Sequence, residues 1–260
     1  HASEKEVIDL LNDKEFDSSY HEVYERAKSM DVSPLLVIGW DFESSLKAVQ
    51  MSEELEGVYA LVGFQPENLE SISEEAIQKI EELTKHPKVV GIGEIGLDYH
   101  WFHDPKDHEN QKKWFIRQLE LADKLDLPVS IHAREALGDT LDILRVHSPK
   151  RKGVLHCYSG SVETMMELEK LGYYFGFDGP VTFKNAKEPK RCVESCPLER
   201  LLVETDSPYM APTPLRGTVN EPKNIPLIVT AMAELKGISI DKLAEVMQKN
   251  LERLFRVKHE

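Results

Sequence analysis

The feature that most constrains the fold of this chain is a set of short apolar runs, each ending in a polar or metal-seeking side chain. The runs cover residues 90–94, 129–132, 154–156, 201–206 and, less regularly, 59–65. A strand that is buried on both faces reads as a continuous stretch of Val, Ile and Leu. In a closed parallel barrel, the groups that follow the strands gather at the C-terminal mouth. The pattern therefore predicts a barrel with its site at one rim.

The apolar runs alternate with amphipathic stretches of helical length, which predicts repeated β–α units and a parallel sheet. We expect strands at 6–9, 35–40, 59–64, 89–95, 128–132, 153–157, 173–177 and 201–204, and helices at 19–30, 42–55, 73–85, 108–125, 135–146, 162–171, 188–196, 226–235 and 239–254. The prediction is a single domain over residues 1–260, an α/β fold of the (β/α)8 TIM barrel type with an extra C-terminal helix. A doubly wound open sheet is the alternative, but it would gather its site at one switch point.

The formal net charge of −14 limits the partners that the surface can bind. Proteins that grip duplex DNA by its phosphates usually carry a basic face. If DNA is a substrate, we expect metal ions and a few Arg or Lys residues to hold an end or a single strand of it. The acidic balance also disfavours binding to a membrane surface.

Neither a membrane span nor an export signal is expected. No apolar run approaches the ~20 residues that span a bilayer, and the first residues lack the basic and apolar regions of a signal peptide. The chain has three cysteines, an odd number, which fits a reducing compartment. We therefore expect a cytoplasmic protein.

Glu94 lies inside an apolar run that has glycines at 91, 93 and 96. Glycine lets backbone and ligand approach closely. A carboxylate in an apolar strand is costly to bury unless it is paired or metal-bound. We expect Glu94 to be a metal ligand in preference to a member of a structural salt bridge. Asp98, at the end of the same motif, fits a loop-capping role and a site role equally well.

His132 and His156 each end an apolar run on a predicted strand. A lone histidine after such a run is more often a satisfied core residue than a ligand. Two of them on successive strands, together with Glu94, favour metal binding, because neighbouring strand ends lie side by side at a barrel mouth. The other histidines fall in loops or on helix faces, where we expect them to be solvated; His100 and His103, in the loop after Glu94, are the exception.

Glu204 and Asp206 follow the last apolar run two residues apart. Residues i and i+2 of a strand point to the same face, so both could face the barrel interior if the strand is still regular there. Asp206 would then hold a metal or take a proton from the attacking water, and Glu204 would lie deeper and brace a ligand. The alternative is a charged strand end without a role.

Six motifs together resemble the TatD family of metal-dependent deoxyribonucleases, within the amidohydrolase-like barrels. They read GEIGLD (93–98), IHAREA (131–136), HCYSG (156–160), VTFK (181–184), ETDSPY (204–209) and RGTVNEP (216–222). They occur in the family's order through nearly the whole chain. The resemblance implies that Glu94 bridges two metals and that His132 and His156 bind one. It also implies that Asp206 is a ligand and the base.

The same resemblance implies which side chains contact the substrate. Arg134, Ser159 and Arg216 would be candidates for binding its phosphate groups. At 63–66 the family's Gly-x-His-Pro is replaced by Gly-Phe-Gln-Pro. Gln65 can still donate a hydrogen bond to phosphate, but it cannot act as a cation.

A second departure concerns the first predicted strand. Family members open with a strand that ends Asp-x-His-x-His-Leu, whose histidines hold the other metal, but Asp9 is followed directly by LLNDKEFD. Either the sequence omits a short stretch there, which the fit on both sides favours, or one metal has lost its ligands. His1 precedes the strand and does not replace them.

The prediction from the sequence is a metal-dependent hydrolase acting on ester bonds, in the first place a deoxyribonuclease that cleaves phosphodiesters with a metal-activated water. Carboxylate and imidazole ligands leave Mg²⁺, Mn²⁺ and Zn²⁺ open as the metal. We expect two ions per chain, roughly 3.5–4 Å apart, if a stretch is omitted, and one ion if it is not. The alternatives are an impaired barrel that binds metal or nucleotide, and an amide or lactone hydrolase.

Overall fold

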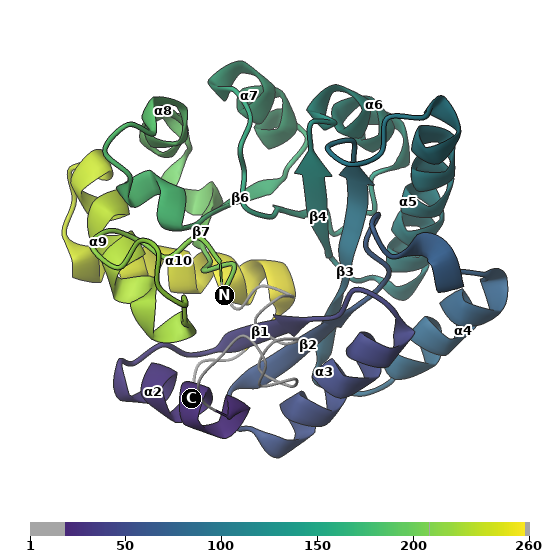
Figure 1. Cartoon of the computed structure of the whole chain (residues 1–260), viewed down its shortest axis with the longest axis horizontal. Coiled ribbons are helices and arrows are strands. Elements are labelled where there is room, and N and C mark those ends of the chain that lie inside the picture. Colours follow the sequence, from purple (N-terminus) through teal and green to yellow (C-terminus); the bar gives the residue numbers. More distant parts are fainter. Residues whose placement is uncertain (1–18, 208, 258–260) are drawn as a thin grey trace.

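A computed structural model describes residues 19–207 and 209–257. The strand expected at 6–9, and the position after Asp9 where the sequence departs from the family pattern, lie outside the described residues. Within them, seven strands form one sheet in the order β1 to β7, and each neighbouring pair is parallel. The sheet curls around on itself with helices on its outer side (Figure 1).

The strands lie where the sequence predicts them. They are β1 (Leu35–Ile38), β2 (Val58–Val62), β3 (Val89–Asp98), β4 (Val129–Arg134), β5 (Gly153–Leu155), β6 (Tyr174–Phe177) and β7 (Leu201–Val203). Two of them run longer than expected, because β3 and β4 continue to pair as far as Asp98 opposite Arg134. Asp98 therefore belongs to a strand.

Helices connect the strands along the chain. They are α2 (Tyr20–Ser29), α3 (Phe42–Glu54), α4 (Glu74–Leu83), α5 (Pro105–Leu125), α6 (Leu137–His147), α7 (Val162–Lys170), α8 (Lys187–Ser195), α9 (Ile225–Lys236) and α10 (Ile240–Phe255), with 3-10 turns η1 (Leu69–Ser71), η2 (Gly179–Thr182), η3 (Leu198–Arg200) and η4 (Pro222–Asn224). The α5 helix begins earlier than expected, because the Asp104 side chain caps it and proline suits its first position. None of the helices in the described ranges is long and apolar enough to cross a membrane.

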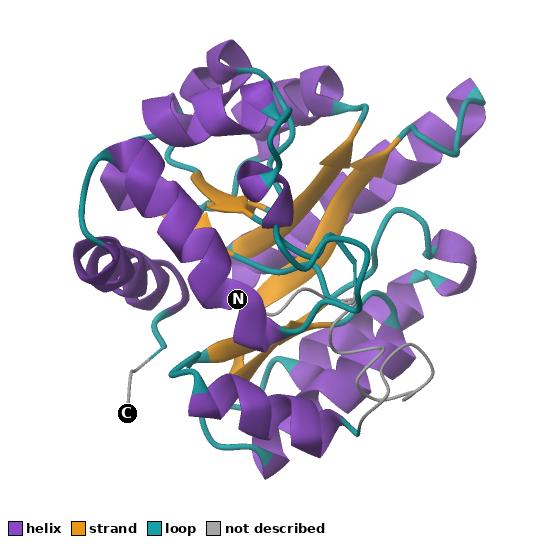
Figure 2. Cartoon of the chain, turned by 60° about the vertical axis from the view of Figure 1, so that its left-hand side comes forward, coloured by secondary structure: helices purple, strands orange, loops and turns teal. Residues whose placement is uncertain are grey.

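Strand side chains alternate between two apolar clusters, as the two-residue period of a strand requires. Leu35 and Val37 of β1 pack in the layer between the sheet and the helices, which enclose the strands (Figure 2). Leu36 and Ile38 belong to a second cluster inside the curl. This cluster, which we call the floor, consists of Leu36, Ile38, Leu61, Val90, Val154, Tyr174, Leu202, Leu251, Leu254, Phe255 and Val257.

The end of α10 closes the barrel from below, at the end where the strands begin. Arg151, in the loop before β5, donates a hydrogen bond to the carbonyl oxygen of Leu254 at 2.6 Å. Phe255 reaches the start of β3, because a Cβ at Gly91 would lie 3.2 Å from its ring. The extra C-terminal helix is therefore part of the core at the N-terminal ends of the strands.

Four strands, β1, β2, β5 and β7, end earlier than expected, and two of them bear on the site. Because β5 ends at Leu155 and β7 at Val203, His156 and Glu204 come directly after regular strand. Asp206 lies in a turn with a φ of 55°. The expectation that Glu204 and Asp206 share one face of a regular strand is therefore wrong, and the turn sets their directions instead.

Candidate metal centre

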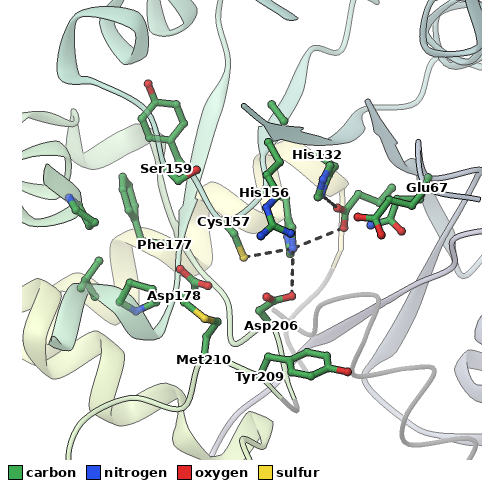
Figure 3. A pocket seen from close by; sticks show the side chains of 18 residues that line it. Glu67, His132, His156, Cys157, Ser159, Phe177, Asp178, Asp206, Tyr209 and Met210 are labelled. Atoms are coloured by element: carbon green, nitrogen blue, oxygen red, sulfur yellow. Dashed lines mark hydrogen bonds and ion pairs between the residues drawn. The ribbon is translucent and has the colours of Figure 1, made fainter. Parts of the chain in front are cut away.

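A pocket of about 460 Å³ opens at the C-terminal ends of the strands (Figure 3). Seven of the nine side chains that the sequence predicts for the site line it: Gln65, Glu94, His132, Arg134, His156, Ser159 and Asp206. They come from strand ends and from the loops that follow strands, from β2 through β7. The pocket is thus one site assembled from most of the sheet, as a barrel mouth is.

His132 is held between two buried carboxylates. Its Nδ1 lies 2.9 Å from Oε1 of Glu94, and its Nε2 lies 2.8 Å from Oδ2 of Asp98. Burial would raise the pKa of Asp98, but the hydrogen bond and charge of His132 outweigh it and lower that pKa to about 2. Burial would lower the pKa of His132, but the two carboxylates raise it to about 9.

Asp98 fills both roles that the sequence left open. Its Oδ1 accepts a hydrogen bond from the backbone N–H of His100 at 2.9 Å, which shapes the loop after β3. Its other oxygen orients His132. The buried amide of Gln111 fixes the strand at this point, because it accepts from the Asp98 N–H at 2.8 Å and donates to the Asp98 carbonyl at 2.9 Å.

His156 repeats this arrangement on the other side of Glu94. Its Nδ1 forms an ion pair with Oε2 of Glu204. Its Nε2 lies 3.6 Å from Oε2 of Glu94 and 3.8 Å from Oδ1 of Asp206. Each histidine therefore turns one nitrogen toward Glu94 while a deeper carboxylate holds the other, which is how carboxylates commonly orient metal-binding histidines.

Glycines make room for this arrangement of strands and carboxylates. A Cβ at Gly176 would lie 1.6 Å from Oε1 of Glu204, so β6 must carry glycine there. A Cβ at Gly96, where φ is 147°, would lie 1.9 Å from the carbonyl oxygen of His132. The glycines around Glu94 were expected to let backbone and ligand approach closely, and Gly93 and Gly96 do let the backbone of β4 lie close to β3.

Three carboxylate or thiol side chains that line the pocket were not predicted from the sequence: Glu67, Cys157 and Asp178. Cys157 Sγ lies 3.3 Å from Nε2 of His156. Asp178 is buried, and this burial, followed by the charges of Asp206 and Glu204, raises its pKa to about 8. A signal for Asp178 was present, because it follows the apolar run of β6 as the predicted ligands follow theirs.

The remaining predicted residues lie in the pocket wall, at its rim or outside it. Arg134 and Ser159 are exposed and line the pocket, whereas Gln65 is buried in its wall. Arg216 does not line it; its guanidinium lies over the Phe183 ring, 3.9 Å from the centroid. His100 pairs with Glu135 at 3.0 Å and stays outside the lining, as does His103.

The donor set suits divalent cations. Nitrogen, oxygen and sulfur atoms lie within 4.8 Å of one another in three groups: Glu67 with Asp98 and His132, His156 with Cys157 and Glu204, and Cys157 with Asp178 and Asp206. Buried carboxylates need a compensating positive charge. Six carboxylates and two imidazoles at or beside one pocket meet that need best when a cation is bound.

Three comparisons with known proteins show what this chain is similar to. The family model described as TatD related DNase matches residues 10–256. An uncharacterized metal-dependent hydrolase, YabD, of Bacillus subtilis is 42% identical over 95% of this chain and 96% of its own length. Another, YcfH of Escherichia coli K12, is 35% identical over 96% of this chain and 93% of its own.

A solved structure extends the agreement to the fold. The TatD homologue YJJV of Escherichia coli K12 superposes with a TM-score of 0.86 at 30% sequence identity, and the match covers 92% of each chain. The predicted barrel class is therefore confirmed. The predicted family is confirmed as well, because the family model covers nearly the whole chain.

Proposed function

This chain belongs to the family of TatD-related DNases, and from that premise we propose that it is a metal-dependent hydrolase that cleaves phosphodiester bonds in DNA. The observation that carries the proposal is the symmetric pair of histidines around Glu94. His132 and His156 each present one nitrogen to this carboxylate and have the other held by a buried carboxylate. Such bracing is typical of metal-binding histidines.

Glu94, His132, His156 and Asp206 would hold one or two divalent ions, of Mg²⁺, Mn²⁺ or Zn²⁺. A bound ion would lower the pKa of a water molecule and offset charge on the phosphoryl oxygens. The four side chains fit this task because all line one pocket and carry nitrogen or carboxylate donors. Glu94 would bridge, because both of its oxygens face a histidine, one on each side.

Asp206 is the best placed general base. Its side chain is 24% exposed, so water reaches it, while Glu94 and Glu204 are buried. It lies opposite His156 at the mouth, where a substrate would enter. We propose that Asp206 takes the proton of the attacking water, and that Asp98 and Glu204 hold the two histidines in position.

Side chains around the rim suit the phosphates of a DNA strand. Arg134 and Ser159 line the pocket and are exposed, and the Gln65 amide can donate from the wall. Four of the nine residues 183–191 are basic, and Arg216 stacks on this segment at Phe183. Because the chain as a whole is acidic, this local basic surface favours a strand end or single strand over an extended duplex.

A cytoplasmic location is part of the proposal. All three cysteines are free thiols. Free thiols are typical of proteins in reducing compartments. We propose that the enzyme works there on short or single-stranded DNA.

The test is hydrolysis of end-labelled single-stranded and duplex oligonucleotides by metal-stripped protein, with Mg²⁺, Mn²⁺ or Zn²⁺ added back singly. We expect metal-dependent cleavage of the single strand, lost in Asp206→Asn purified in parallel. Equal activity of that variant would indicate a contaminating nuclease. Cleavage of amide or lactone substrates alone would replace DNA as the substrate class, and metal binding without any hydrolysis would favour the impaired barrel.

A further inference from the structure

We infer that Cys157 is a thiolate ligand of this centre and that, with His156, Asp178 and Asp206, it selects Zn²⁺ or a similar thiolate-binding ion. The inference rests on the proposed function in one respect, because both require a cation in this pocket. It adds two donors, Cys157 and Asp178, to the four that the sequence predicts.

The distances match two ligands of one ion. Sγ of Cys157 lies 3.3 Å from Nε2 of His156, and the same nitrogen lies 3.8 Å from Oδ1 of Asp206 (Figure 3). With bonds of about 2.3 Å to sulfur and 2.1 Å to nitrogen, two ligands of tetrahedral zinc lie about 3.6 Å apart. The separations of the sulfur and of the Asp206 carboxylate from Nε2 of His156 therefore lie within tenths of an ångström of those between two ligands of one ion, and the sulfur and an Asp206 oxygen lie within 4.8 Å of each other.

Asp178 supplies an independent indication of a cation. It is only 7% exposed, and no ion pair among residues 19–207 and 209–257 includes it. One of its oxygens lies within 4.8 Å of Sγ of Cys157 and of an Asp206 oxygen. A buried carboxylate must be paired, neutralised or metal-bound. Neither Cys157 nor Asp206 carries a positive charge, so a cation bound among the three would stabilise the ionised form of Asp178.

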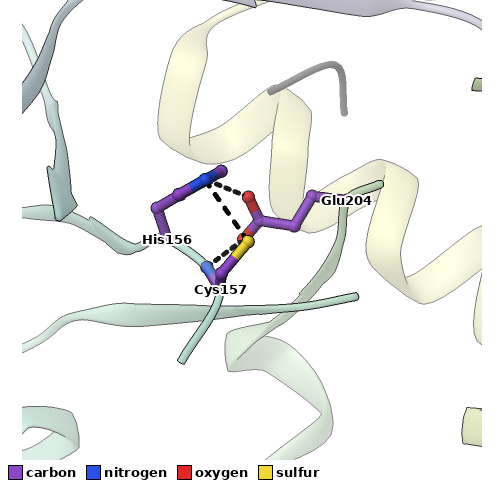
Figure 4. A group of neighbouring side chains, drawn as sticks. All are labelled: His156, Cys157 and Glu204. Atoms are coloured by element: carbon purple, nitrogen blue, oxygen red, sulfur yellow. Dashed lines mark hydrogen bonds and ion pairs between the residues drawn. The ribbon is translucent and has the colours of Figure 1, made fainter. Parts of the chain in front are cut away.

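A single carboxylate holds both adjacent donors in place. Glu204 pairs through Oε2 with Nδ1 of His156 and through Oε1 accepts the Cys157 N–H at 2.8 Å (Figure 4). The left-handed φ of 44° at Cys157 turns the chain directly after His156. The sulfur and the ring nitrogen are therefore fixed relative to each other before any ion binds, which favours binding.

The sulfur donor determines the class of ion. Thiolates prefer Zn²⁺ and comparable ions, whereas Mg²⁺ and Mn²⁺ prefer oxygen ligands. The other two cysteines provide matched controls, because both are buried in or beside α8 away from the pocket lining. Cys192 Sγ donates to the carbonyl oxygen of Gly160 at 3.4 Å.

The experiment loads metal-stripped protein with Co²⁺ alone and records its absorption spectrum, with Cys157→Ser and Cys192→Ser examined in the same way. Sulfur bound to Co²⁺ gives a charge-transfer band in the near ultraviolet. We expect this band in the wild type and in Cys192→Ser, and its loss in Cys157→Ser. Competition titrations should show Zn²⁺ affinity falling at least ~10-fold in Cys157→Ser, with Mn²⁺ affinity nearly unchanged.

A wild type that binds Co²⁺ without the band, or does not bind it, overturns the inference, as does a band that persists in Cys157→Ser. Thermal unfolding of each variant shows whether a lost band reflects lost structure. If Cys157→Ser does not fold, Asp178→Asn replaces it, and unchanged Zn²⁺ affinity in that variant refutes the four-donor site. Failure of the proposed function is a separate result: absence of DNA cleavage with every metal, whatever the spectrum shows.

Discussion

The two ends of the barrel interior are built from opposite kinds of side chain. The mouth buries four carboxylates, Glu94, Asp98, Asp178 and Glu204, around two histidines. The floor is apolar and closed by the end of α10. Burying a carboxylate costs free energy, whereas burying a large apolar side chain contributes roughly 1.5–3 kcal/mol. We therefore expect the floor to contribute most to the stability of the fold and the mouth to bind the ion.

The floor and the mouth also share one small cavity. Phe255 of the floor lines a small cavity that His156 and Glu204 line from above. A change at one end could therefore be transmitted to the other by contact. The following substitutions test whether stability and metal binding separate as the comparison requires.

The largest effect is expected from Glu94→Gln, which removes the charge at the centre of the mouth and keeps its shape. Losing the metal contribution of several kcal/mol should lower the hydrolysis rate by on the order of 10³-fold or more. The fold should persist, because apolar layers hold the barrel. Initial rates measure hydrolysis, and thermal unfolding measures whether the fold persists. Glu163→Gln, on the exposed face of α7, is the control. A variant that retains most of its activity would show that Glu94 is not the bridging ligand.

Phe255→Ala makes the converse change at the floor. Phe255 is 2% exposed, and deleting a buried phenylalanine typically costs about 3–5 kcal/mol of unfolding free energy. Metal affinity per folded molecule should stay near that of the wild type. Urea unfolding and calorimetric metal titration at low temperature measure the two quantities, and Ile240→Ala, at an exposed position of the same helix, is the control. A large loss of metal affinity with little loss of stability would refute the division of roles.

Asp98→Asn and Glu204→Gln each remove a carboxylate that orients a histidine. Substitutions of such residues typically weaken metal binding about 10–100-fold. The loss of metal affinity should be larger for Glu204→Gln than for Asp98→Asn, because Glu204 holds both His156 and the Cys157 N–H. Competition with a chromogenic chelator gives the affinities. If both variants bind metal as tightly as the wild type, these carboxylates are not needed to orient the histidines.

The smallest effect is expected at the start of α10, whose far end forms part of the floor. The Ser239 side chain accepts from the Lys242 N–H, and replacing such a cap with alanine costs about 1 kcal/mol. Ser239→Ala should lower the urea midpoint slightly and leave hydrolysis unchanged. Ser239→Asp should restore the midpoint, and a failure to restore it would argue against the cap as the cause.

Much of the site was predictable because strand ends of a parallel barrel share one rim. Glu94, His132, His156 and Asp206 each follow or end an apolar run, and the structure brings all four to one pocket. The same rule, applied to the run that ends at Phe177, would have added Asp178. Arg216 could not be placed from the sequence, because it does not directly follow a strand and it contacts Phe183, a residue far from it in the sequence.

The sequence by itself determined the order of strands and helices, the parallel barrel and the rim that carries the polar groups, because hydrophobic periods are local properties of the chain. Only the tertiary structure decided which nitrogen of each histidine faces Glu94, that Cys157 and Asp178 join the pocket, and that the end of α10 completes the floor. These features depend on backbone turns after the strands and on contacts between residues far apart in sequence. Neither leaves a periodic signal in the residues themselves.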